Sequence, residues 1–240
     1  MKHPEILQDM RSDQEAYKMT LYPVTESFIS INGEGRKAGT LSCFLRMRGC
    51  NLCCNYCDTR WACEPDAEAK MLSAEDIVAW VTESGIRNIT LTGGEPLLTQ
   101  GVNPLLSALA GIPGAEIEIE TNGSVPLADF FPVPDPVFFT MDLKCPGSGM
   151  QKHNCMENLS LLRQKDVVKY VVSDRADLDW MRETVTEYRL TERCGIYVGA
   201  VFGRIDPLQI VDYLKEYKMN RVHLQLQLHK YIWDPMQRGV

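Results

Sequence analysis

The chain of 240 residues has no apolar run long enough to cross a lipid bilayer, and its first 20 residues contain no apolar segment typical of an export signal. It also has no excess of basic residues, since 25 Lys and Arg face 32 Asp and Glu, for a net charge of −7. Nucleic acids and anionic membranes favour a basic face, so neither is an expected partner. These absences predict a cytoplasmic location.

Disulfide pairing is not expected either. The nine cysteines are an odd number, and four of them fall within residues 50–57. In a chain without an export signal, such crowding favours metal or cluster binding over disulfide bonds. The rest of the composition, with 45% apolar residues, is ordinary for a globular protein with a buried core.

Strand-like and helix-like segments alternate from about residue 21 onward. The predicted strands are 24–31, 43–48, 88–92, 115–120, 137–142, 167–172, 195–201 and 221–228. Amphipathic stretches, predicted as helices, begin at Ser73 and cover 103–110, 156–163, 177–188 and 207–217, with capping signals at Ser73 and Asp206. This alternation predicts parallel strands joined by helical crossovers. About six such units predict an α/β fold, an incomplete TIM-type barrel, with residues 1–20 as an N-terminal extension and 21–240 as a single domain.

The crowded cysteines are Cys50, Cys53, Cys54 and Cys57, on a loop directly after a predicted strand. Structural zinc usually takes two short ligand pairs from separate chain segments, which one compact loop does not provide. Three thiolates on one loop can hold three corners of a cubane [4Fe–4S] cluster and leave the fourth iron open. The spacing alone allows two triplets, with either Cys53 or Cys54 as the middle ligand.

The spacing that uses Cys54 as the middle ligand is C-x3-C-x2-C, with Tyr56 directly before the last cysteine. It resembles the signature of the radical S-adenosylmethionine superfamily. Two further segments, TGGEP at 92–96 and EIETNG at 118–123, resemble other elements of that superfamily, although the second is equally typical of a strand and an Asn-Gly turn. The resemblance implies a [4Fe–4S] cluster on Cys50, Cys54 and Cys57, with Cys53 as a bystander. The positions that it places around S-adenosylmethionine are Tyr56, Asp58, Gly94, Asp142, Leu143 and Lys144.

Residues 26–35 (ESFISINGEG), the FLR segment at 44–46 and the Asp58–Thr59 pair resemble, within that superfamily, the family of 7-carboxy-7-deazaguanine synthases. The resemblance implies a radical ring contraction of 6-carboxy-5,6,7,8-tetrahydropterin to 7-carboxy-7-deazaguanine, with loss of ammonia. It also implies Mg²⁺ at Thr59, a flavodoxin or ferredoxin as electron donor, and a homodimer. The substrate contacts that it implies are Ile31, Asn32, Gly33, Arg46, Thr92 and Val240, although many members have Gln at the position of Asn32.

Several alternatives remain open from the residues alone. Arg46 and Arg48 share one face of an ideal strand, so periodicity does not decide which of them faces a substrate. Thr59 could cap a turn instead of binding a metal. The rival functions are an activase that installs a glycyl radical on a partner protein, and a non-catalytic zinc or electron-carrier module.

Overall fold

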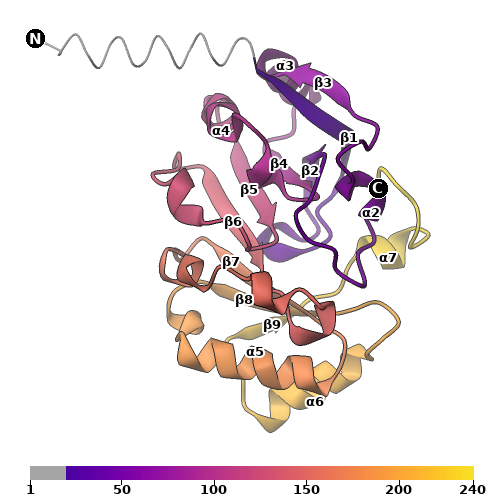
Figure 1. The fold of residues 1–240 in the computed structure, drawn as a ribbon, viewed down its shortest axis with the longest axis vertical. Helices are drawn as coiled ribbons and strands as arrows, with labels where there is room; N and C mark the ends of the chain where they lie inside the picture. The colour runs from indigo at the N-terminus through magenta and orange to yellow at the C-terminus, as the bar shows by residue number, and fades with distance from the viewer. Residues whose placement is uncertain (1–19) are drawn as a thin grey trace, which may run out of the picture.

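One sheet of nine strands forms the framework of the computed structural model, which describes residues 20–240 (Figure 1). The strand order is β3-β1-β2-β4-β5-β6-β7-β8-β9. Neighbouring strands from β2 to β9 are parallel, whereas β1 is antiparallel to both β2 and β3. The strands are β1 (Leu21–Ile31), β2 (Leu41–Met47), β3 (Lys70–Ser73), β4 (Asn88–Gly93), β5 (Glu116–Thr121), β6 (Val137–Asp142), β7 (Val167–Val172), β8 (Gly195–Ala200) and β9 (Val222–Leu224).

The sheet curves without closing, because β3 and β9 lie at opposite ends of the strand order. The seven parallel strands are joined in six steps, as the predicted incomplete barrel requires. The α-helices are α2 (Arg60–Cys63), α3 (Ala74–Ser84), α4 (Val102–Ala110), α5 (Arg175–Glu187), α6 (Pro207–Glu216) and α7 (His229–Ile232). Figure 1 shows α5 and α6 lying along β7, β8 and β9. No helix within residues 20–240 is both long and apolar enough to span a bilayer.

Two helix starts follow the predicted capping chemistry. The Ser73 hydroxyl accepts the N–H of Asp76, and the Asp76 carboxylate accepts the N–H of Ser73, so α3 begins with a capping box. Asp206 caps α6 in the same reciprocal way with Gln209, and Pro207 occupies the first helical position.

Three local predictions differ from the structure. The strand predicted at 221–228 is shorter, because only β9 (Val222–Leu224) pairs with β8. The segment predicted as helix 156–163 forms only a 3-10 turn, η6 (Met156–Ser160). The buried Asn158 side chain explains this difference, because it donates to the carbonyl of Val125 and accepts the N–H of Leu127, which ties the segment to the preceding loop. Strand β3 was not predicted, since four residues at a sheet edge carry too little periodicity.

The remaining 3-10 turns are η1 (Gly35–Lys37), η2 (Pro96–Leu98), η3 (Leu127–Phe130), η4 (Pro146–Ser148), η5 (Gln151–His153) and η7 (Leu190–Glu192). Between β5 and β6, and between β6 and β7, such turns replace the expected crossover helices. The predicted extension at 1–20 lies, except for Thr20, outside the described residues.

Alternation along the parallel strands separates the core from the barrel interior. The residues that pack under the helices include Leu45 on β2, Leu91 on β4 and Ile119 on β5, all fully buried. Their sequence neighbours on the other face include Arg46 and Glu120, which line a pocket. Parallel strands are usually apolar on both faces, so this polar inner face marks the interior as a binding site.

Candidate active site

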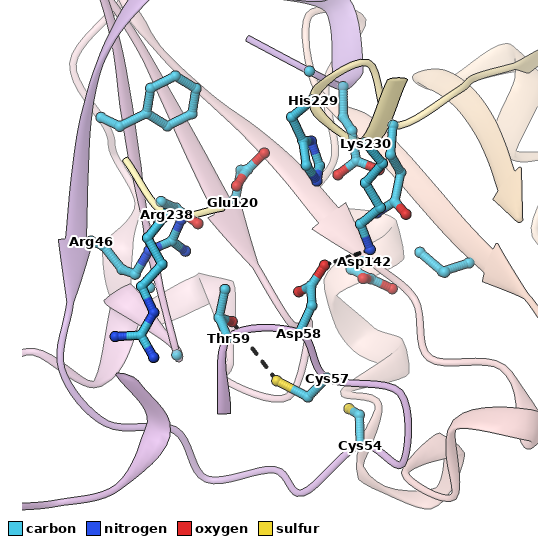
Figure 2. A pocket seen from close by; sticks show the side chains of 18 of the residues that line it. Arg46, Cys54, Cys57, Asp58, Thr59, Glu120, Asp142, His229, Lys230 and Arg238 are labelled. Atoms are coloured by element: carbon cyan, nitrogen blue, oxygen red, sulfur yellow. Dashed lines mark hydrogen bonds and ion pairs between the residues drawn. The ribbon is translucent and has the colours of Figure 1, made fainter. Parts of the chain in front are cut away.

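The pocket lies at the carboxyl ends of β2, β4, β5 and β6, with a cavity volume of about 360 Å³ (Figure 2). Barrel folds place their chemistry at this end of the strands. The cysteine loop follows β2, the TGGEP turn follows β4, and Asn122 and Lys144 follow β5 and β6. Segments far apart in the sequence therefore meet at one edge of the sheet.

The cysteine loop is fixed by backbone hydrogen bonds to α2. The N–H of Gly49 donates to the carbonyl of Ala62 at 2.9 Å, and the N–H of Cys50 donates to the carbonyl of Cys63 at 3.0 Å. The short helix α2 thus folds back over the start of the loop. These bonds hold the loop against the mouth of the barrel.

Three of the four crowded thiols line the pocket. Cys50, Cys54 and Cys57 line the pocket, whereas Cys53 is exposed and receives a hydrogen bond from Arg60 on the outside of the loop. Figure 2 shows the side chains of Cys54 and Cys57 at the base of the pocket. This arrangement corresponds to the C-x3-C-x2-C triplet.

Two of the three thiols, Cys50 and Cys57, favour the thiolate form. A hydrogen bond from the Cys63 thiol lowers the pKa of Cys50 and of Cys57 to about 6, and the thiolate is the form that binds iron. Burial raises the pKa of Cys54. Among residues 20–240, no three Cys, His, Asp or Glu side chains converge as closely as the ligands of a single ion do. A cubane holds its thiolates on separate iron atoms and accepts a wider triangle.

The TGGEP turn packs directly on the cysteine loop. The N–H of Glu95 donates to the carbonyl of Gly49 at 2.8 Å, and a Cβ added at Gly94 would lie 2.1 Å from the same oxygen. Only glycine permits this approach. The Glu95 carboxylate points away from the pocket and is fully buried, where it accepts the N–H of Asn122 at 2.6 Å and the hydroxyl of Thr121. Burial raises the pKa of Glu95 to about 7.

The EIETNG segment is therefore more than a strand and turn. Through Glu95 it is bonded to the TGGEP turn, and its Asn122 amide lies 3.5 Å from the Cys50 sulfur. The carboxyl end of β5 is thereby connected to the turn after β4 and to the cysteine loop after β2.

Two polar atoms of the pocket have no hydrogen-bond partner among the described residues. The Tyr56 hydroxyl and one Asp142 oxygen, Oδ1, are buried without a hydrogen-bond partner among the described residues, and both side chains line the pocket. The other Asp142 oxygen accepts from Lys144 at 2.9 Å. A bound ligand could supply the missing hydrogen bonds of these two atoms. Gly94 contributes backbone that a ligand can approach closely.

Leu143 departs from the expected cofactor set. Its side chain is fully buried in the hydrophobic core, since it alternates with Asp142 and Lys144, and only these two line the pocket. Its N–H donates to the carbonyl of Lys169 at 2.9 Å.

Thr59 and Asp58 extend the loop toward the centre of the pocket (Figure 2). Thr59 occupies the N-cap position of α2, but its hydroxyl makes no capping hydrogen bond and lies 3.8 Å from the Cys57 sulfur. The hydroxyl therefore does not serve to cap the turn. Asp58 forms an ion pair with Lys230 at 2.8 Å, which joins the loop to α7.

All six residues expected to contact the substrate line this one pocket: Ile31, Asn32, Gly33, Arg46, Thr92 and Val240. Arg46 is held by Glu26, whose carboxylate accepts from Nε at 3.0 Å. Strand β2 ends at Met47, so Arg48 turns away and its guanidinium bonds the carbonyl of Ala67. The structure thus shows that Arg46 lines the pocket and Arg48 does not, a distinction that strand periodicity left open.

Asn32 is buried and its polar groups are already engaged. Its amide donates to Glu118 at 2.6 Å and to Thr90 at 3.1 Å, and its oxygen accepts the N–H of Glu34. Its backbone N–H and carbonyl bond Thr40 and Gly39. A contact between the Asn32 amide and a substrate would have to displace one of these bonds.

Sequence reasoning missed several residues of the pocket. Cys63, which lies outside the crowded cysteine loop, lies 3.9 Å from Cys57, sulfur to sulfur, and lines the pocket. Glu120 projects a carboxylate into the cavity, and no described residue pairs with it (Figure 2). Its position on the inner face of β5, two residues after the buried Glu118, was the available signal.

The C-terminal segment also closes over the pocket. Arg238 stacks on the Trp61 ring with 4.0 Å from its Cζ to the ring centre, and Arg46 lies 5.9 Å from the same ring. Val240 reaches the cavity through this segment. His229 packs against Gly33, where a Cβ would meet its Nδ1 at 2.8 Å. The Arg238–Trp61 and His229–Gly33 contacts join residues 177 and 196 positions apart, and they bring the predicted Val240 to the pocket.

Comparison with known proteins agrees with this site. The Radical SAM superfamily profile matches residues 44–145, from β2 to just beyond β6. The 7-carboxy-7-deazaguanine synthase of Clostridium acetobutylicum is 48% identical over 219 residues, which cover 91% of this chain and 99% of the relative. The chain belongs to the 7-carboxy-7-deazaguanine synthase family.

A second member of this family, from Chlorobaculum tepidum, is 36% identical over 90% of this chain and 96% of its own length. The crystal structure of QueE from Escherichia coli has a TM-score of 0.70 at 21% identity, covering 90% of this chain and 97% of that one. This likeness confirms the predicted incomplete barrel. As a radical S-adenosylmethionine enzyme, the chain uses a [4Fe–4S] cluster and S-adenosylmethionine.

Proposed function

We propose that this chain converts 6-carboxy-5,6,7,8-tetrahydropterin to 7-carboxy-7-deazaguanine with loss of ammonia, a step of queuosine and deazapurine biosynthesis. One observation carries most of the weight. In a chain 48% identical over nearly its whole length to a 7-carboxy-7-deazaguanine synthase, the three loop thiols and the Arg46 guanidinium line the same pocket.

The cofactors have a natural place in this pocket. Cys50, Cys54 and Cys57 would hold the cluster, and S-adenosylmethionine would lie against Gly94, with Tyr56 and Asp142 as hydrogen-bonding partners. When bound, the cluster and S-adenosylmethionine would supply the radical chemistry that removes a hydrogen atom from the substrate. The barrel walls exclude water from that event.

The substrate carboxylate is assigned to Arg46. Glu26 occupies Nε, which leaves both terminal nitrogens of the guanidinium for a bidentate pair with a carboxylate. The unpaired Glu120 carboxylate suits the N–H groups on the amino-pyrimidinone edge of a pterin. Arg46 and Glu120 thus offer opposite charges to opposite ends of one ring system.

Thr59 is proposed to bind Mg²⁺. Its hydroxyl makes no capping hydrogen bond to α2, and the residue lines the cavity. One hydroxyl is a weak site alone, so substrate oxygens and waters would complete the octahedron.

The electron donor, the assembly and the location are proposed from the family resemblance. We propose a flavodoxin or ferredoxin as electron donor, a homodimer as the assembly, and the cytoplasm as the location, where thiols stay reduced. Residues 21–240 are proposed to act as one domain, with 1–20 as an extension.

The test is an anaerobic assay with cluster-reconstituted protein, S-adenosylmethionine, Mg²⁺ and a low-potential reductant. The expected result is formation of 7-carboxy-7-deazaguanine and ammonia from 6-carboxytetrahydropterin, and no product from the matched Cys54→Ala variant. An inert pterin, together with a glycyl-radical signal on a partner protein, would instead establish the activase.

A further inference from the structure

Electrons must reach the cysteine loop from outside, and the outer face of that loop carries unpaired positive charge. We propose that Arg60 and Arg204, on either side of residues 53–55, form a docking surface for an acidic, one-electron carrier protein. This inference rests on the proposed function, because it concerns how the cluster on that loop is reduced.

Exposed and buried residues alternate where the two arginines contact the loop. Cys53 and Asn55 are exposed, whereas Cys54 between them is buried and faces the pocket. A carrier placed over Cys53 and Asn55 would therefore lie against the residues on both sides of the Cys54 ligand position. Electron transfer favours a short path to the ligand position.

Both arginines are bonded to this layer. Arg60, at the start of α2, donates to the Cys53 sulfur at 3.1 Å and to the Cys54 carbonyl at 3.3 Å. Arg204, just beyond β8, donates to the Asn55 side-chain oxygen at 3.0 Å and to its carbonyl at 3.4 Å. The two guanidiniums therefore lie over the middle of the loop.

Their charges are not neutralised. Both side chains are exposed, and neither has an acidic partner within residues 20–240. By contrast, the exposed Arg175 forms an ion pair with Glu216, and the exposed Arg189 forms one with Glu192.

A third exposed cation, Lys152, belongs to a turn next to a residue that contacts the loop. Lys152 lies in η5, two residues after Met150, whose sulfur accepts the N–H of Cys53 at 3.5 Å. Unpaired cations around the redox loop of a chain with net charge −7 favour an acidic partner. A nucleic acid is disfavoured by the same overall charge.

The test measures reduction of the cluster in the reconstituted full-length protein, without pterin, by stopped-flow absorbance. The reductant is either reduced flavodoxin or dithionite. Charge reversal by Arg60→Glu or Arg204→Glu should slow reduction by flavodoxin about tenfold at low salt. The difference should shrink at 1 M salt, where the Debye length is about 3 Å.

Three controls separate charge from loop distortion. Arg60→Lys and Arg204→Lys keep the charge, and flavodoxin should reduce the cluster of both variants at nearly the wild-type rate. Arg221→Glu makes the same reversal at an exposed residue before β9, at the amino end of its strand and away from the carboxyl ends where the cysteine loop lies, and should have no effect. Iron content and reduction by dithionite should be unchanged in every variant.

Two outcomes would overturn the proposal. One is an unchanged rate with flavodoxin in both reversal variants. The other is an equal loss with flavodoxin and dithionite, which would show that the arginines only shape the loop. Pterin turnover by the wild-type protein with dithionite tests the proposed function separately, so the two failures are distinguishable.

Discussion

Replacing Gly94 by alanine would place a methyl group between the TGGEP turn and the cysteine loop. The added Cβ would lie 2.1 Å from the Gly49 oxygen, 2.5 Å from its carbonyl carbon and 2.7 Å from the Cys50 Cβ. Ordinary contacts lie beyond about 3.5 Å, and two of the three obstacles are backbone atoms that no rotamer change can move. The loop would have to shift by more than 1 Å.

Such overpacking typically costs 1–3 kcal/mol, and the rigid obstacle places this variant near about 3 kcal/mol. For a domain of this size the melting temperature should fall by roughly 6–12 °C. Cys50 moves with Gly49, so we also expect the variant to lose most of its iron after reconstitution.

Thermal unfolding and iron and sulfide analysis check both expectations. Gly85→Ala is the control, because Gly85 has a positive φ of 73° but nothing lies within 4 Å of its added Cβ, so this variant carries backbone strain without a steric clash. It should lower stability by about 1–2 kcal/mol through the backbone alone and keep its iron. Full iron content in Gly94→Ala, with a stability loss no larger than that of Gly85→Ala, would refute the reasoning.

Three further changes have equally definite outcomes. Cys53→Ala should keep the cluster and Cys54→Ala should lose it, as measured by iron content; the reverse result would identify the other triplet. Arg46→Ala should raise the KM for the pterin about tenfold or more, by loss of a charged hydrogen-bond pair, and leave uncoupled S-adenosylmethionine cleavage intact. Burial raises the pKa of Glu118 to about 7, so the folded state holds its proton more tightly than the unfolded chain. Stability should therefore fall as pH rises from about 4.5 to 7, and urea unfolding of Glu118→Gln should show a flatter profile; an unchanged slope would contradict this assignment.

Local sequence chemistry accounts for much of the fold and part of the site. Capping signals at Ser73 and Asp206 predicted two helix starts, and strand alternation predicted the parallel framework. The helix expected at 156–163 failed because its polarity pattern said nothing of the long-range bonds made by Asn158.

The site shows the same division. The spacing of Cys50, Cys54 and Cys57 is local, and these thiols do line one pocket. The engagement of the Asn32 amide with Glu118 depends on how strands pair, and no residue near either one in the sequence signals it. Contacts of this kind become visible only when the sheet is assembled.

The central claim is that three thiolates of one loop hold a cubane with an open iron. Electron paramagnetic resonance of the anaerobically reconstituted, reduced protein tests it most directly, together with iron and sulfide analysis. The account predicts equal amounts of iron and sulfide, and a reduced-cluster spectrum that changes when S-adenosylmethionine is added. Bound zinc without iron or sulfide, or a cluster spectrum indifferent to S-adenosylmethionine, would contradict it.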